Sequence, residues 1–186
     1  MLAAYLAERF SARLFVPLAL ALSMAASAGD LSIGALATDA GFALMLLAQF
    51  RSWDDLADRG HDAVSHPRRV IVQAASIAPV VAFSGALAIA NICLAVERDG
   101  SGISVIVLTA LIFTLGVWYS LRTGRTAAGD HLLLFKYPAM VVVLAGARVL
   151  SAPGSILGSA LVLYVAVCAY EVWHDPASPL SIGGHR

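Results

Sequence analysis

Hydrophobic residues form long continuous runs along this chain, where a strand would alternate polar and apolar positions. Six runs stand out: Leu14–Ala28, Ile33–Phe50, Val70–Val96, Ile103–Leu121, Leu132–Leu150 and Ser155–Trp173. Most approach the roughly 20 residues that an α-helix needs to cross the hydrocarbon core. The first run is shorter, but it can extend back through Phe10. Because backbone groups in lipid must pair within their own segment, the runs predict α-helices.

The prediction is therefore an all-α membrane protein, a bundle of about six transmembrane helices in a single domain spanning residues 1–186. Composition agrees, because 60% of the residues are hydrophobic and only 13% are charged. Soluble domains are near half apolar and a quarter charged, so the excess apolar surface faces lipid. The 12 basic and 12 acidic residues cancel, which excludes the basic field expected of a nucleic-acid partner.

The first run has a second interpretation. Arg9 and Arg13 precede Leu14–Met24, and the small residues Ala25–Gly29 follow. This order also resembles a secretory signal with a cleavage site. Glu8 and the long start before the run favour a retained helix, and the remaining helices keep their orientation in both cases.

Basic residues separate by membrane side when the N-terminus is placed in the cytoplasm. Only Arg98 and Arg148 then lie outside. The other ten lie inside: Arg9, Arg13, Arg51, Arg59, Arg68, Arg69, Arg122, Arg125, Lys136 and Arg186. The positive-inside rule thus predicts an inner or plasma membrane protein with both termini cytoplasmic.

Four aspartates follow the second run on the predicted cytoplasmic side. If that helix continues past Trp53, Asp55, Asp58 and Asp62 fall at i, i+3 and i+7 and share a face, with Asp54 beside them. Gly60 could instead end the helix and move Asp62 into the loop. Such like charges repel unless a cation binds, and oxygen ligands without thiols favour magnesium. The alternative is a solvated loop in which acids and arginines pair.

Other polar residues could complete a phosphate site on the same side. Glu171 and Asp175 at i, i+4 form a second acidic pair, or an ordinary helix end. Arg68, Arg69 and Arg122 could bind phosphate, and Lys136 could either do so or extend to the interface.

Asp39 lies inside the second run. It is either a functional intramembrane carboxylate or, if the helix starts near Ala37, an interfacial residue at the outer side.

These motifs resemble a known family. Asp54-Asp55-x-x-Asp58-x-x-x-Asp62, followed by His66-Pro67-Arg68, is similar to the first aspartate-rich motif of the UbiA prenyltransferase family, which usually has Asn at the position of Asp54. Glu171-x-x-x-Asp175 resembles the second motif, with Glu replacing the first Asp. Tyr119-Ser120-Leu121-Arg122 resembles the Tyr-Pro-x-Lys segment between them.

The resemblance implies a shortened UbiA-type bundle that transfers a prenyl group from a polyprenyl diphosphate to a lipophilic acceptor. It assigns magnesium to Asp54, Asp55, Asp58, Asp62, Glu171 and Asp175, with Asp55, Asp58 and Asp62 as the catalytic set. It assigns the diphosphate to Arg68, Arg122 and Lys136. The family usually has about nine helices, so a homodimer could complete the cavity. The alternatives are a noncatalytic isoprenoid-binding or scaffold protein and a small cation transporter.

Overall fold

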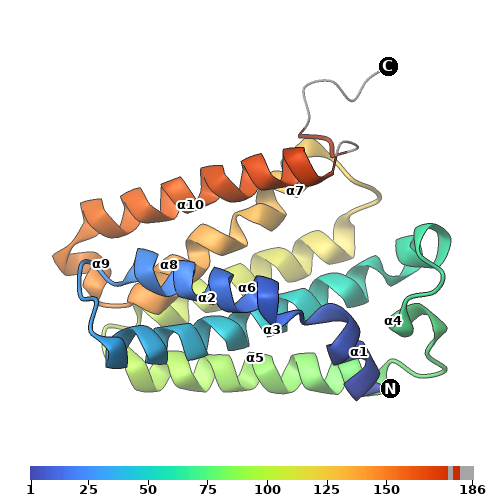
Figure 1. Cartoon of the computed structure of the whole chain (residues 1–186), viewed down its shortest axis with the longest axis horizontal. Coiled ribbons are helices and arrows are strands. Elements are labelled where there is room, and N and C mark those ends of the chain that lie inside the picture. Colours follow the sequence, from blue (N-terminus) through green and yellow to red (C-terminus); the bar gives the residue numbers. More distant parts are fainter. Residues whose placement is uncertain (176–177, 181–186) are drawn as a thin grey trace.

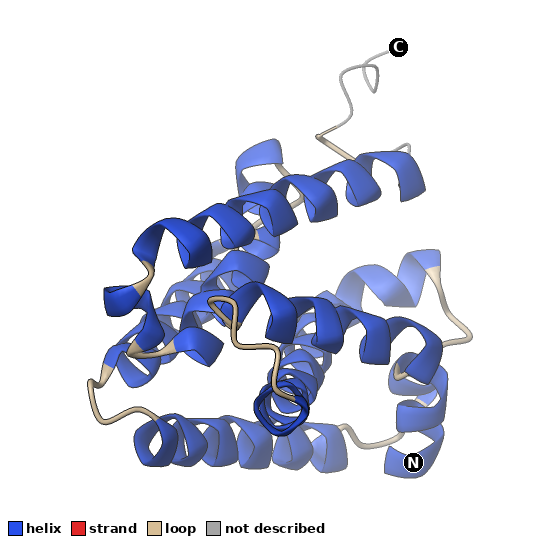
Figure 2. Ribbon diagram, turned by 60° about the vertical axis from the view of Figure 1, so that its left-hand side comes forward, coloured by secondary structure: helices blue, strands red, loops and turns tan. Residues whose placement is uncertain are grey.

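The computed structural model describes residues 1–175 and 178–180, and these residues form helices and loops without a strand (Figures 1 and 2). The predicted all-α fold is confirmed. Arg186, counted above as a cytoplasmic charge, lies outside the described residues. The helices are α1 (Leu2–Arg9), α2 (Ala12–Ala26), α3 (Ile33–Ser65), α4 (Val70–Gln73), α5 (Ala78–Arg98), α6 (Ile103–Leu121), α7 (Ala127–Leu134), α8 (Lys136–Ala145), α9 (Arg148–Ser151) and α10 (Pro153–His174).

Five segments are long and apolar enough to cross a membrane: α3, α5, α6, α7 with α8, and α10. A sixth results if α1 and α2 count as one span, although the chain bends by 69° between them. The first run therefore does not continue straight back through Phe10. Several apolar helices of this kind indicate an integral membrane protein with multiple spans.

Two predicted runs are interrupted, and prolines mark both places. The run predicted over Val70–Val96 divides into α4 and α5, and Pro79 lies in the first turn of α5, where its missing N–H costs nothing. The run predicted over Leu132–Leu150 begins earlier, at Ala127, and divides at Phe135, three residues before Pro138. It stops at Ala145 because Gly146 takes a φ of +52°, outside the helical range.

The apolar core lies where α2, α3, α5, α6 and α8 pack together. Leu22, Leu46, Phe50, Leu115 and Met140 are fully or almost fully buried there. α10 runs along one side of the bundle and packs on α8 and α2 (Figure 1). Its outward side chains Leu161, Val162 and Val165 are more than half exposed, as expected of a helix that faces lipid.

The helices separate two polar ends. In Figure 1 the N-terminus and the end of α10 lie at the same end of the bundle, together with α4 and α7. The opposite end holds the α2–α3 connection and α9. We call the first the α7 end and the second the α9 end. The assignment of the α7 end to the cytoplasm stays a prediction.

Candidate functional site

α3 places its four aspartates at the α7 end. The helix continues through Gly60 to Ser65, so Asp62 is helical and not part of a loop. At about 1.5 Å per residue, its 33 residues extend roughly 50 Å, well beyond the ~30 Å of a hydrocarbon core. The aspartates occupy the turns beyond the apolar part and belong to a regular helix.

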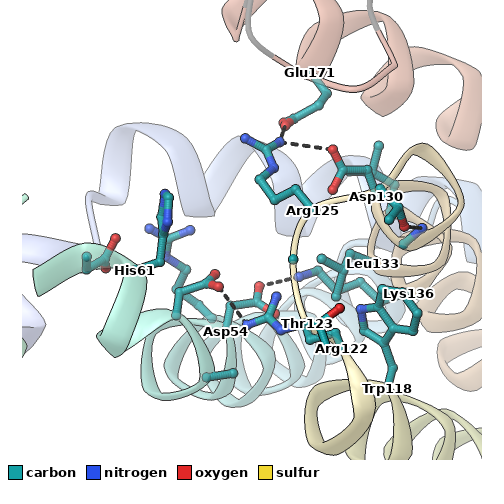
Figure 3. A pocket seen from close by; sticks show the side chains of 18 of the residues that line it. Asp54, His61, Trp118, Arg122, Thr123, Arg125, Asp130, Leu133, Lys136 and Glu171 are labelled. Carbon is teal, nitrogen blue, oxygen red and sulfur yellow. Dashed lines mark hydrogen bonds and ion pairs between the residues drawn. The ribbon is translucent and has the colours of Figure 1, made fainter. Parts of the chain in front are cut away.

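A cavity of about 520 Å³ opens beside these turns. Four elements contribute charged side chains to its wall: α3, the end of α6 with the loop after it, α7 with α8, and α10. These side chains are Arg51, Asp54, Asp58, Asp62, Arg122, Arg125, Asp130, Lys136 and Glu171. Figure 3 shows two groups of them, Asp54 with Arg122 and Lys136, and Arg125 with Asp130 and Glu171.

In the first group, Asp54 connects α3 to α6 and α8. It accepts hydrogen bonds from the Tyr119 hydroxyl and the Lys136 ammonium group. Lys136 is only 7% exposed, so it does not extend to the interface as the alternative interpretation had it. A buried ammonium group requires such a carboxylate to offset its desolvation, which fixes α8 against α3.

Asp58 and Asp62 follow one and two turns later. Arg122 donates to Asp58 at 2.6 Å and lies over the Tyr119 ring, 4.9 Å from its centre. Asp62 pairs with Arg69, and the His66 ring lies 3.7 Å from it. The acids are thus paired with basic groups, as the alternative interpretation expected, but across elements of a folded helix bundle.

Asp55 does not line the cavity. It points toward α1, where it accepts hydrogen bonds from the Tyr5 hydroxyl at 2.9 Å and from Arg9 at 2.6 and 2.9 Å. Arg51 lies 3.4 Å away. The bend between α1 and α2 brings Arg9 into this position. Asp55 was predicted as a catalytic residue. In the structure its carboxylate instead holds α1 against α3 through Tyr5 and Arg9.

Glu171 of α10 lines the same cavity, and Asp175 follows the last residue of that helix. Arg125 binds Asp175 at 2.8 Å, Asp130 at 2.9 Å and Glu171 at 3.3 Å. Partial burial lowers the pKa of the Arg125 guanidinium, but the hydrogen bonds to Asp175 and Asp130 outweigh it and raise that pKa above its ordinary value. Asp130 and Arg125 were absent from the predicted site. The Thr126 hydroxyl that caps α7, accepting from Gly129 N–H at 3.1 Å, was the local signal that could place Asp130 on a helix.

Arg68 was predicted to meet the diphosphate. It is exposed on the turn after α3 and is not among the side chains that line the cavity. Its neighbour Arg69 reaches Asp62 instead. Among the predicted phosphate ligands, Arg122 and Lys136 are the two that meet at the cavity.

Within residues 1–175 and 178–180, no three histidine, cysteine or acidic side chains lie close enough to hold a metal ion by themselves. The cavity carboxylates provide oxygen ligands alone. Magnesium commonly takes one or two carboxylates together with phosphate oxygens, and this donor set fits such an arrangement.

Asp39 forms a separate polar cluster at the α9 end. It is only 2% exposed and bridges Arg98 and Arg148, which donates to it at 2.8 Å. Because α3 starts at Ile33, Asp39 lies in the second turn, buried between two arginines and not at an exposed interface. A second cavity of about 430 Å³ lies beside this cluster.

Comparison of the chain with protein-family models, with curated proteins and with solved structures finds no match.

Proposed function

We propose that this protein is a UbiA-like intramembrane prenyltransferase, which uses magnesium to transfer a prenyl group from a polyprenyl diphosphate to a lipophilic acceptor. One observation carries the proposal. A single cavity at the polar end of an apolar helical bundle joins Asp54, Asp58 and Asp62 of α3 with basic groups from other elements and with Glu171 of α10. A ligand with a charged head and an apolar tail suits this position.

In this proposal the basic side chains of the cavity bind the diphosphate and the acidic ones bind magnesium. Arg122 and Lys136 would bind diphosphate oxygens, because both already bind carboxylate oxygens in the same wall. Asp54, Asp58, Asp62, Glu171 and Asp175 would hold magnesium. When bound, magnesium neutralises negative charge on the departing diphosphate. Asp55 anchors α1 and is left out of the magnesium set.

The pairing of acids and bases explains how so many charged side chains share one cavity wall. Unpaired charges of one sign would repel, whereas each pair here neutralises its partner. A magnesium diphosphate brings both signs, so the bases can exchange carboxylates for phosphate oxygens without leaving the acids uncompensated. The proposal therefore requires magnesium and diphosphate to bind together. Either one added without the other should bind only weakly.

Aromatic side chains near the diphosphate position would assist bond cleavage. The bond from the allylic carbon to oxygen breaks, and its electron pair leaves with the diphosphate. The allylic cation bonds to the acceptor, which loses a proton. Tyr137 lines the cavity beside Lys136, where its ring face can stabilise the cation.

A second function is favoured by the same pairs. If Arg122 and Lys136 keep their carboxylates, the protein binds the isoprenoid without turning it over, as a noncatalytic binder or scaffold.

Diphosphate release tests these functions. Purified protein in lipid nanodiscs would receive magnesium, farnesyl diphosphate and a membrane lipid extract as the acceptor source. We expect diphosphate release that requires magnesium and falls about 100-fold or more in Asp58→Asn and in Arg122→Gln. Asp30→Asn, an exposed change at the α9 end, is the matched control.

The outcomes separate the hypotheses. Binding without release supports the noncatalytic function. Cation flux in sealed vesicles without isoprenoid binding supports a transporter. It contradicts both the prenyltransferase and the noncatalytic isoprenoid binder. Helical circular dichroism of each variant checks that loss of release does not reflect unfolding.

A further inference from the structure

The loop between α6 and α7 lines the cavity and pairs with several of the elements around it. We call residues 122–126 the strap. Arg122, at its start, reaches Asp58 on α3. Arg125 reaches Asp130 on α7 and Glu171 on α10 (Figure 3), and also Asp175 just after α10. Two arginines three residues apart thus tie opposite sides of the opening.

The two arginines differ in how firmly they are held. The Arg122 side chain is 14% exposed and packs on the Tyr119 ring, whereas the Arg125 side chain is 44% exposed. Ion pairs in contact with water contribute little to stability. Arg125 can therefore leave its carboxylates at little cost when a stronger acceptor arrives.

Phosphate is such an acceptor. The planar guanidinium group binds phosphate with two parallel hydrogen bonds, which are stronger than bonds to a shared, solvated carboxylate. Arg125 now serves three carboxylates at once, at 2.8, 2.9 and 3.3 Å. A cation that binds Glu171 and Asp175 would lower their hold on the guanidinium and release it toward the cavity.

We propose that Arg125 is an additional phosphate-binding residue, and that its transfer from the α7 and α10 carboxylates to the ligand draws the strap over the cavity. This rests on the proposed function, because the ligand is the magnesium diphosphate head described above. The strap closes only when both magnesium and phosphate are present, since each frees one partner of the existing ion pairs.

Binding of farnesyl diphosphate with magnesium to the full-length protein in nanodiscs tests the role of Arg125. We expect Arg125→Gln to bind roughly tenfold more weakly. Arg125→Lys should bind more tightly than Arg125→Gln, because it keeps the positive charge but lacks the paired N–H donors of the guanidinium group. Arg13→Gln removes an exposed positive charge from α2 without touching the cavity, and it should bind like the unmodified protein.

A nitroxide label on Thr123→Cys reports the strap itself, with Cys93 and Cys168 replaced by serine. Its mobility should fall when magnesium and farnesyl diphosphate are added together and not when either is added alone. Equal binding by Arg125→Gln and Arg13→Gln, or an unchanged label, overturns this inference while the proposed function stands. Failure of the unmodified protein to bind overturns both.

Discussion

Asp99, in the turn between α5 and α6, is a carboxylate held in its charged form by its neighbours. It is 6% exposed and accepts hydrogen bonds from the Ser101 hydroxyl at 2.6 Å, the Ser104 N–H at 2.7 Å and the Ser101 N–H at 3.0 Å. Burial alone would raise the pKa of this group. The hydrogen bonds outweigh burial and lower its pKa from 3.8 to about 2.

This pKa predicts a pH-dependent contribution to stability. Because the folded-state pKa is depressed, the contribution is complete above about pH 4 and disappears as the pH falls through about 2. We expect Asp99→Asn to lower the thermal midpoint at pH 6, and the difference from the unmodified protein to shrink between pH 4 and pH 2. Thermal unfolding in detergent, followed by tryptophan fluorescence, measures it. A difference that is equal at pH 6 and pH 2 contradicts the assignment.

Gly129 is a second residue whose identity the packing fixes. A Cβ at this position would lie 2.2 Å from an atom of the Trp118 ring, which lines the cavity. Gly129→Ala should therefore displace the ring and destabilise the protein by about 1–3 kcal/mol. Gly158→Ala on α10 meets open space and should be neutral or stabilising by up to about 1 kcal/mol. Denaturant unfolding of the pair decides, and equal effects would refute the packing argument.

At the scale of helices, the hydrophobic runs predicted that a helix is present more reliably than they predicted where it begins and ends. The run Ile103–Leu121 is α6 residue for residue, because polar segments end it on both sides. The divisions at Gln73–Ala78 and Phe135 lie inside mostly apolar runs that hold only single polar residues, so local backbone chemistry decides where the helices break. The bend before α2 depends on a distant pair, Arg9 with Asp55, which no local pattern contains.

The contact between α3 and α5 includes a buried amide pair in the apolar region. Asn91 donates to the Gln49 side-chain oxygen at 2.7 Å, and each amide keeps one buried atom without a partner among the described residues. Replacing one amide by an apolar side chain leaves the other unpaired in a medium without water.

A double-mutant cycle follows from this pair. We expect Asn91→Leu alone to destabilise the protein by about 1–3 kcal/mol, and the combined Gln49→Leu and Asn91→Leu variant to recover most of that loss. Unfolding of the reconstituted protein by denaturant gives the four free energies. Additive losses would show that the two amides do not support each other.

At the scale of the whole molecule, the sequence predicted which polar side chains lie at one end of the bundle, but it did not predict how they pair. Asp54, Asp58 and Asp62 of α3 line one cavity with Glu171 of α10, as their order along the chain suggested. Which base meets which acid depends on helix rotation and tilt, and those are set by packing in three dimensions. For that reason the sequence did not predict that Asp55 turns toward α1 or that Arg125 pairs with Asp130 and Glu171.

The membrane orientation of the bundle is open to a direct test. The distribution of basic residues predicts the strap in the cytoplasm and the α5–α6 turn outside. An impermeant maleimide added to intact cells should label Gly100→Cys and reach Thr123→Cys only after permeabilisation, with both native cysteines replaced by serine. Both positions are exposed. The reverse pattern would invert the topology.

The overhang of α3 beyond the hydrocarbon core has a kinetic consequence. It places the charged cavity beyond the apolar part of the helix, so under the proposed function an isoprenoid keeps its tail in the bilayer while its head is bound. Encounter is then a two-dimensional search within the leaflet. Occupancy follows the mole fraction of isoprenoid among lipids, and diluting the vesicles in buffer at fixed lipid composition leaves it unchanged.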